Sequence, residues 1–139
     1  MAADARVVTM TDAIERIAPA GLAPPAGHYS HAVRHGGLIL TSGQLGARAD
    51  GTHTADLPFE DQARQALSNM LAAVAAGGAG PHDILKVTAY IVGVENWPRF
   101  NAVYAELLGD ARPARTVVPV PELRYGYLVE VDAIAVTRA

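Results

Sequence analysis

The stretch Pro58–Ala76, PFEDQARQALSNMLAAVAA, is the clearest helix in this chain of 139 residues. Its apolar side chains recur at spacings of three and four, which places them on one side of an α-helix. They are Phe59, Ala63, Leu67, Met70, Leu71 and Val74. Gly77 and Gly78 follow directly, as expected where a helix ends. A helix with one apolar side must cover another apolar layer, which the rest of the chain has to supply.

Segments typical of β-strands lie on both sides of this helix. Rich in β-branched and apolar residues, they are Tyr29–Arg34, Leu38–Ser42, Ile84–Val92, Ala114–Val120 and Tyr127–Thr137. A second helix is predicted over Glu95–Leu108, with its apolar residues on one side. This order favours an α+β fold in which one mixed sheet carries both helices on one face. The other face would still be apolar, and a symmetry-related copy is the simplest partner for it.

Length and composition indicate a single domain over residues 1–139. Residues 1–26 are interpreted as an N-terminal arm and a Pro/Gly/Ala loop, because the arm is too short to bury a core alone. The chain has no cysteine, which excludes disulfides, thiolate metal sites and cysteine nucleophiles. Its net charge of −3 argues against a nucleic-acid partner. We find no signal peptide and no apolar run long enough to span a membrane, and therefore expect a cytoplasmic protein.

Arg115 is the first candidate for chemistry, because it lies within the apolar strand Ala114–Val120. A guanidinium there must be paired or lie at a pocket edge, since burying an unpaired charge is costly. Its planar fork matches a carboxylate in two parallel hydrogen bonds. The residues alone favour a structural salt bridge to Glu130, Asp132 or Glu122 over a ligand.

Glu130 is the second candidate. Strand alternation places Glu130 and Asp132 on one face of a segment that is otherwise apolar. An acid in such a run is either paired or has a raised pKa, which suits general acid–base catalysis. A solvent-facing edge strand explains the pattern equally well.

Three histidines, His28, His31 and His35, resemble a metal cluster, but their spacing argues against one. On a strand His28 and His31 would point to opposite faces, and His31 and His35 would lie far apart. We therefore expect no metal site, and regard a histidine that lines a pocket as the better interpretation. No histidine–carboxylate pair is recognisable around Ser42, so a nucleophilic triad is unsupported.

Five segments, in this order, resemble the Rid/YjgF family of imine and enamine deaminases, which includes endoribonuclease L-PSP-like proteins. They are Leu40–Gln44, Gln62–Asn69, Phe100–Tyr104, Pro113–Thr116 and Val129–Ala135. Each segment is weak evidence alone, whereas the ordered set is specific for the fold. The resemblance covers roughly residue 27 to the C-terminus.

The resemblance implies a chorismate-mutase-like subunit and a homotrimer around a central barrel, with a pocket at each subunit interface. It implies hydrolysis of reactive imines such as 2-aminoacrylate and 2-imino acids to keto acids and ammonia, without a cofactor. Arg115 matches the residue that holds the substrate carboxylate, and Glu130 matches the acid near the reacting carbon. Further pocket positions fall on Tyr29, Ser42 and Asn101.

The sequence departs from the family pattern near this pocket. Val117 stands where many of these deaminases carry cysteine, and His28 and His31 replace the proline and glutamine of a Gly-Pro-Tyr-Ser-Gln segment. The segments Pro119–Pro121 and Tyr125–Tyr127 are also unusual and are expected to reshape the pocket rim. These changes leave room for a specialised enzyme that acts on a larger imine, with His31 and Val117 among the substrate-binding positions.

Two functions remain after this reading. The first is a hydrolytic imine or enamine deaminase that uses Arg115 and Glu130. The second is a non-catalytic trimer that binds a small carboxylate or keto acid through the same arginine and does not need Glu130. A ribonuclease, the label of some relatives, finds no support in the charge balance.

Overall fold

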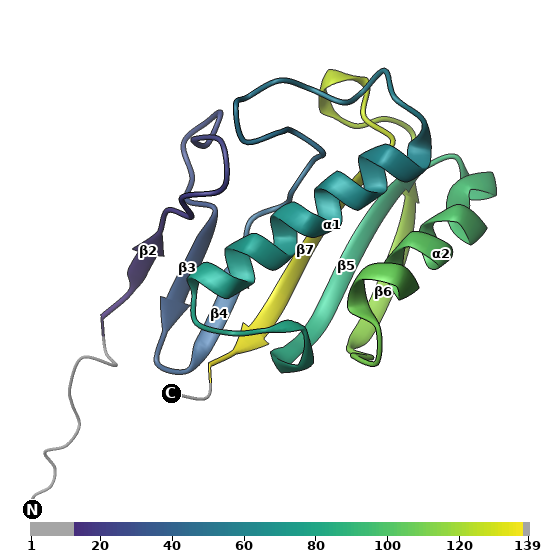
Figure 1. Ribbon diagram of the computed structural model, residues 1–139. Helices are drawn as coiled ribbons and strands as arrows, with labels where there is room; N and C mark the ends of the chain where they lie inside the picture. Colours follow the sequence, from purple (N-terminus) through teal and green to yellow (C-terminus); the bar gives the residue numbers. More distant parts are fainter. Residues whose placement is uncertain (1–12, 138–139) are drawn as a thin grey trace, which may run out of the picture.

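The computed structural model describes residues 13–137, so the first twelve residues of the predicted arm lie outside it. Figure 1 shows one twisted sheet with two helices packed in front of it. The sheet has six strands in the order β2-β3-β4-β7-β5-β6. Their bounds are β2 Glu15–Ile17, β3 Ala32–His35, β4 Leu38–Thr41, β5 Ile84–Val92, β6 Ala114–Val120 and β7 Val129–Val136. The helices are α1 Phe59–Ala76 and α2 Trp97–Leu108, and the 3-10 turns are η2 Pro81–Asp83, η3 Val94–Asn96 and η4 Arg124–Gly126.

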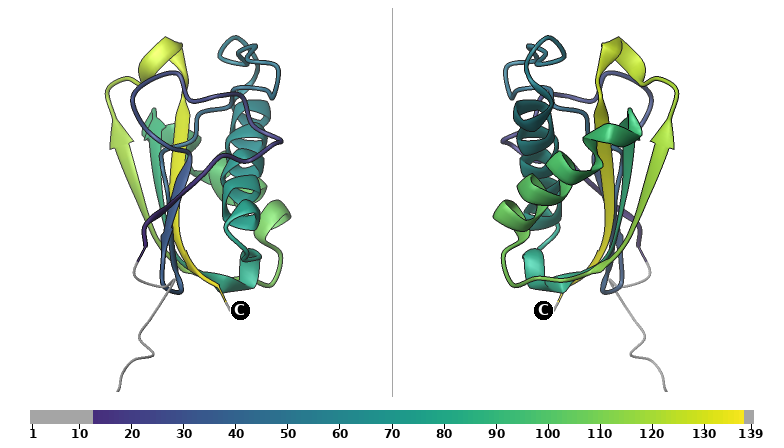
Figure 2. Two further views of the ribbon diagram at one scale, coloured as in Figure 1. Left: turned by 90° about the vertical axis from the view of Figure 1, so that its left-hand side faces the viewer. Right: turned by 90° about the vertical axis from the view of Figure 1, so that its right-hand side faces the viewer.

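The α+β class, the mixed sheet and the two helices on one face are confirmed. β5 and β6 run parallel, and α2 connects them, as a parallel pair requires. All the other strand pairs are antiparallel. Seen edge-on in Figure 2, the sheet forms one layer and both helices form the other.

Several boundaries differ from the sequence prediction. The helix predicted over Glu95–Leu108 begins at Trp97, because Val94–Asn96 form the 3-10 turn η3. β2 was expected to be part of an irregular arm, yet it pairs with β3 and its Glu15 bonds Arg34 through two hydrogen bonds. The strand predicted from Tyr29 begins only at Ala32, and the His31 side chain just before it bonds the carbonyl oxygen of Ala23 and the side chain of Gln44. The strand predicted from Tyr127 begins at Val129, after the turn η4.

The core lies between the sheet and the helices. Alternate residues of β7 and β5 point into it and are fully or almost fully buried: Val129, Val131, Ala133, Ala135, Val87, Ala89 and Ile91. From α1, the side chains of Leu67 and Met70 are completely buried against them. Burying a side chain of this size stabilises the fold by about 1.5–3 kcal/mol, so the apolar residues predicted along one side of Pro58–Ala76 are those that hold the helix on the sheet.

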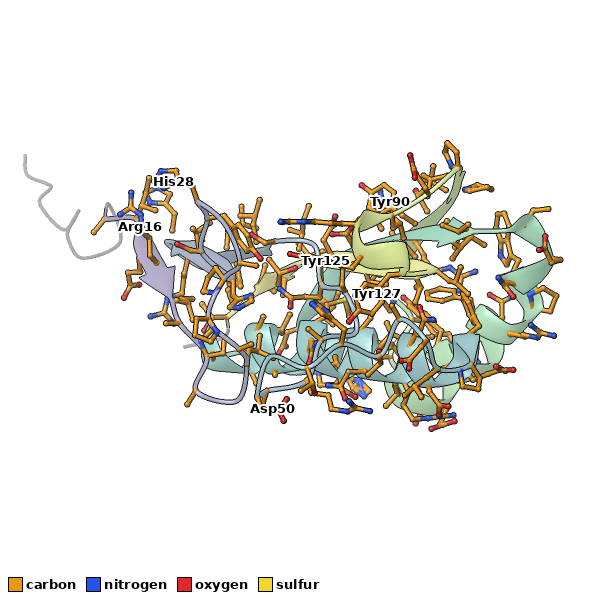
Figure 3. All side chains as sticks on the ribbon, turned by 90° about the horizontal axis from the view of Figure 1, so that it is seen from above. Arg16, His28, Asp50, Tyr90, Tyr125 and Tyr127 are labelled. Carbon is orange, nitrogen blue, oxygen red and sulfur yellow. The ribbon has the colours of Figure 1, made fainter. Side chains whose placement is uncertain are left out.

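The opposite face of the sheet is more polar than expected. Leu38 and Leu40 of β4 are about 40% exposed there, which fits the predicted apolar surface. However, Glu130 and Asp132 of β7 and Tyr90 of β5 share this face, because Tyr90 pairs with Glu130 in register. Figure 3 shows Tyr90 on the side of the sheet away from the helices. We call this surface the open face, and a symmetry-related partner for it stays a prediction.

No helix among residues 13–137 is long and apolar enough to cross a membrane.

One buried side chain connects the layers near the end of the sheet where β7 begins. Gln62 of α1 is fully buried, and its amide nitrogen donates to the carbonyl oxygens of Ala55 and Leu57. Its amide oxygen accepts a hydrogen bond from the backbone N–H of Leu128. The helix, the loop that precedes it and the start of β7 are therefore held by one glutamine.

We expect Gln62→Leu to lower the free energy of unfolding by about 2–4 kcal/mol. The carbonyl oxygens of Ala55 and Leu57 and the N–H of Leu128 would lose their hydrogen-bond partner, and each buried group without a partner costs about 1–3 kcal/mol. Denaturant unfolding measures the change. Gln65→Leu is the matched control, since Gln65 bonds only the Asn69 side chain and should cost under about 1 kcal/mol. Equal losses in the two variants would contradict the bracing role of Gln62.

Candidate active site

A pocket of about 390 Å³ opens where β4 ends and β7 begins. Three segments distant in sequence enclose it, and Figure 1 shows them together above the sheet: the loop before β3, the loop after β4 and the turn η4. Four of the predicted site residues line it, namely Tyr29, His31, Ser42 and Glu130. The fold therefore brings together more than half of the residues proposed from the sequence.

Glu130 lies on the open face at the start of β7, beside Gly43. A methyl group on Gly43 would collide with the Glu130 carboxylate unless that side chain moved, so the glycine lets the carboxylate lie directly against the backbone after β4. Mutual backbone hydrogen bonds between Gln44 and Val131, of 2.7 and 3.1 Å, hold the two segments at this distance. The acid is thus placed against backbone at the pocket wall.

Burial raises the pKa of Glu130 above the ordinary range, and the charge of Asp132 raises it further. The pKa of Asp132 is itself raised by burial, an effect that the positive charge of Lys86 partly opposes. Two neighbouring carboxyl groups whose ionised forms are disfavoured are typical of sites that transfer protons. A carboxyl group with a raised pKa is the better general base and acid near neutral pH.

His31 is 9% exposed, and both of its ring nitrogens are engaged. Nε2 donates to the carbonyl oxygen of Ala23 at 2.6 Å, and Nδ1 accepts from the side-chain amide of Gln44 at 3.1 Å. The ring therefore fastens the loop before β3 to the segment after β4. His31 lines the pocket, as expected, and it also builds the pocket wall.

Ser42 and Tyr29 complete the gathered set. The Ser42 hydroxyl donates to the carbonyl oxygen of Ser30 at 2.6 Å, and the Ser42 backbone N–H donates to the carbonyl oxygen of His31 at 2.8 Å. The Ser42 hydroxyl thus already has an acceptor for its proton. Tyr29 is 45% exposed, and its ring meets the His31 ring edge-on at 6.0 Å.

Arg115 does not line this pocket. It pairs in register with Val87 of β5, whereas Glu130 pairs with Tyr90, three residues further along the same strand. Because side chains alternate along a strand, Arg115 points to the helix face and Glu130 to the open face. The two predicted catalytic residues of one subunit therefore lie on opposite faces of its sheet.

The salt bridge expected for Arg115 is absent from residues 13–137, where the guanidinium has no carboxylate partner. It stacks instead on two aromatic rings of α2, 4.9 Å from the Tyr104 centroid and 5.8 Å from that of Phe100. Stacking of this kind holds the plane of the guanidinium and leaves its N–H donors available. Arg115 lies on β6, which is an edge strand of the sheet.

The other predicted positions also lie apart from the pocket. Asn101 is exposed on α2, and Val117 is half-buried on β6, where it packs against the core. Neither lines the pocket that holds Glu130. The sequence reading thus combined residues of two separate regions of the subunit.

Two pocket residues were missed as candidates, His53 and Arg124, whereas Tyr125 belongs to the segment that the sequence placed at the pocket rim. Tyr125 has a φ of 61°, a left-handed conformation that is rare for a large side chain. The unusual Tyr125–Tyr127 segment was a sequence signal for this place, because Gly126 also has a positive φ and marks a tight turn. Nothing in the pattern around His53 indicated that it would reach the same pocket.

The histidines expected on a strand do not all lie on one. His28 and His31 precede β3, so strand alternation does not govern where their side chains point. Within residues 13–137, no three His, Asp or Glu side chains gather closely enough to hold a metal ion.

The raised pKa of Glu130 has a consequence for stability. The folded protein binds this proton more tightly than the unfolded chain, so the ionised side chain costs stability above the ordinary carboxyl range. We expect Glu130→Gln to raise the melting temperature at about pH 7 and to lose that advantage by about pH 4. Thermal unfolding at both pH values measures it.

Glu106→Gln is the matched control, because hydrogen bonds from Arg64 lower the pKa of Glu106. That variant should lose a little stability at about pH 7 and approach the parent protein in acid. If the change in melting temperature caused by Glu130→Gln is the same at both pH values, folding does not disfavour the ionised form of Glu130.

Comparison with known proteins identifies the family. Residues 20–137 match the family described as Endoribonuclease L-PSP. A 2-iminobutanoate/2-iminopropanoate deaminase of Dermatophagoides farinae is 38% identical over 123 residues, which cover 88% of this chain and 96% of that protein. The solved YjgF gene product of E. coli is 32% identical, with a TM-score of 0.83 over 89% of this chain and 99% of its own. E. coli TdcF, solved with bound serine, is 30% identical, with a TM-score of 0.83 over 88% and 98%. The chain therefore belongs to the Endoribonuclease L-PSP family, that of the YjgF or Rid proteins, as the five ordered segments indicated.

Proposed function

We propose that this protein is a hydrolytic deaminase of small reactive imines and enamines, with a keto acid and ammonia as products. The observation that carries the proposal is the half-buried Glu130, whose pKa is raised and whose carboxyl group lies in a pocket of suitable size. The 38% identity to an iminobutanoate/iminopropanoate deaminase supports the same reaction class.

The substrate carboxylate needs a cation, and Arg115 is the proposed one. Because Arg115 and Glu130 of one subunit face opposite ways, the proposal requires the pocket to be completed by Arg115 of a second copy. An edge strand that carries an unpaired, stacked arginine suits this task, since β6 can lie against another subunit. The exposed Leu38 and Leu40 of the open face favour such an assembly. We propose a homotrimer, as the resemblance implied.

The proposed mechanism uses only water and protein groups, with no cofactor. Arg115 of the neighbouring copy holds the carboxylate in two parallel hydrogen bonds and so fixes the C=N carbon beside Glu130. Ionised Glu130 takes a proton from water as the water oxygen bonds to that carbon, and the C=N electron pair moves to nitrogen. Glu130 then returns this proton to nitrogen, which gives a carbinolamine. Glu130 next takes the carbinolamine hydroxyl proton and passes it to the nitrogen, so that the C–N bond breaks, the oxygen electron pair forms the carbonyl and ammonia leaves.

Arg115→Ala should lower kcat/KM for 2-iminopropanoate by about 100-fold or more, because an unpaired substrate carboxylate loses both binding and orientation. Arg115→Lys should recover only part of the loss, since lysine cannot form the bidentate pair of hydrogen bonds with a carboxylate. Ammonia and pyruvate release measure the rate. Arg99→Ala is the matched control, because Arg99 is an exposed arginine of α2 that reaches Glu60 at 3.7 Å. Full activity of Arg115→Ala would disprove the role of the arginine.

A non-catalytic carboxylate-binding trimer is the alternative, favoured by the bound serine of TdcF. Glu130→Gln separates the two functions. A deaminase should lose turnover by at least about 100-fold and still bind pyruvate, as calorimetry can measure. A binding protein should show no turnover in the parent chain and unchanged pyruvate affinity in the variant.

The shared pocket makes a second prediction about the same pair. Arg115→Ala and Glu130→Gln should each be inactive alone, yet regain activity when the two variants are unfolded and refolded together. In a random mixed ring, about a quarter of the interfaces would join an intact Glu130 to an intact Arg115. Refolding each variant by itself is the control. Mixed rings without activity would contradict a pocket that is built by two copies.

A further inference from the structure

We infer that the pocket contains a second subsite, which takes a planar, apolar side chain of the substrate and is formed by His53, Arg124 and Tyr125. The inference rests on the proposed function and names its substrate class: 2-imino acids with an aromatic or similarly flat side chain. The three residues line the same pocket as Ser42 and Glu130. None of them belongs to the reacting centre proposed above.

The three side chains stack on one another at the pocket wall. The His53 and Tyr125 rings lie 4.4 Å apart between centroids and are tilted by 32°, which is stacking distance. The Arg124 guanidinium lies 4.5 Å from the centroid of the Tyr125 ring. Flat rings and a stacked guanidinium attract other flat groups through their faces and edges.

This stack is held in place before any ligand arrives. Tyr127 is 1% exposed. Its hydroxyl accepts a hydrogen bond from the Thr54 backbone N–H at 3.0 Å and shares another with Nδ1 of His53 at 2.9 Å. The loop after β4 and the turn η4 are thereby joined through Tyr127. Figure 3 shows Tyr125 and Tyr127 close together at the yellow-green turn that precedes β7.

The backbone at Tyr125 is strained in a way that points to function. Within residues 13–137, Tyr125 is the only non-glycine residue with a positive φ. Glycine or asparagine adopts this conformation more readily than tyrosine does. Despite this position the tyrosine ring is 45% exposed, so burial in the core does not explain its presence. Strained residues of this kind cluster at ligand sites.

The size of the pocket favours a larger substrate than a three- or four-carbon imino acid. Its volume of about 390 Å³ falls in the range of roughly 300–1,000 Å³ that holds drug-sized ligands. Apolar side chains of Leu22, Pro24 and Leu45 form further parts of its wall. A substrate whose C=N carbon lies beside Glu130 would leave the remaining space to its side chain.

Arg124 could instead attract a negatively charged side chain, because it has no carboxylate partner within the described residues. Its position over the Tyr125 ring favours a role as part of the stack. The two chemistries make opposite predictions for Tyr125 and Arg124 variants, and the test below includes both.

The experiment compares Tyr125→Asn with Tyr125→Phe. Asparagine tolerates the positive φ, so the turn is kept and the ring is lost. Phenylalanine keeps the ring and is the matched control. Imines are generated in the assay from alanine, phenylalanine and glutamate by an amino-acid oxidase or dehydrogenase, and kcat/KM is measured for each. Binding of pyruvate and phenylpyruvate is measured by calorimetry.

The parent protein should prefer the phenylalanine-derived imine over 2-iminopropanoate by about tenfold or more. Tyr125→Asn should remove this preference, whereas Tyr125→Phe should keep it. No preference in the parent protein, or a preference that survives Tyr125→Asn, would overturn the subsite. A preference for the glutamate-derived imine that Arg124→Ala removes and Tyr125→Asn does not would overturn it as well.

The binding measurement separates this inference from the proposed function. If the parent protein hydrolyses none of the imines, the deaminase proposal fails. The subsite then still predicts that phenylpyruvate binds about tenfold more tightly than pyruvate and that Tyr125→Asn abolishes the difference. If 2-iminopropanoate is hydrolysed and phenylpyruvate binds no better than pyruvate, the subsite alone fails.

Discussion

The alternation of side chains along β7 is the constraint on which the rest of this structure depends. β7 lies inside the sheet, between β4 and β5, and its residues Val129 and Val131 are completely buried beneath the helices. The same geometry forces Glu130 and Asp132 onto the open face. Buried apolar residues and acids can alternate along one strand only because its two faces meet different surroundings. Core and candidate catalytic acid are therefore set by a single strand.

The pocket around Glu130 depends on side chains that connect loops. Gln62 fixes the loop before α1 to the start of β7, His31 fixes the loop before β3 to the segment after β4, and Tyr127 fixes the turn η4 to the loop that carries His53. Each of the three is nearly or fully buried. Loops without regular hydrogen bonding need such partners for their backbone groups, and here the partners are also what shapes the pocket.

Under the proposed function, Arg115 belongs to a site that two copies of the chain share. In one subunit its guanidinium is held flat by Tyr104 and Phe100, and it points away from the face that carries Glu130. Under the proposed function, neither residue forms a complete site in its own subunit. Activity would then require assembly, and the exposed leucines of the open face would contribute to catalysis indirectly by favouring that assembly.

The sequence by itself determined the fold class, both helices, the alternation that exposes Glu130 and the membership of the family. These follow from local periodicity and from ordered motifs, which need no knowledge of how distant segments meet. Only the tertiary structure decided that Tyr29, His31, Ser42 and Glu130 share a pocket. It also showed that Arg115 and Asn101 lie elsewhere and that His53 and Arg124 join the pocket wall. The physical reason is that a pocket is built from contacts between segments far apart in the chain. Their register, and the bonds of Gln62, His31 and Tyr127 that connect them, leave no periodic trace in the sequence.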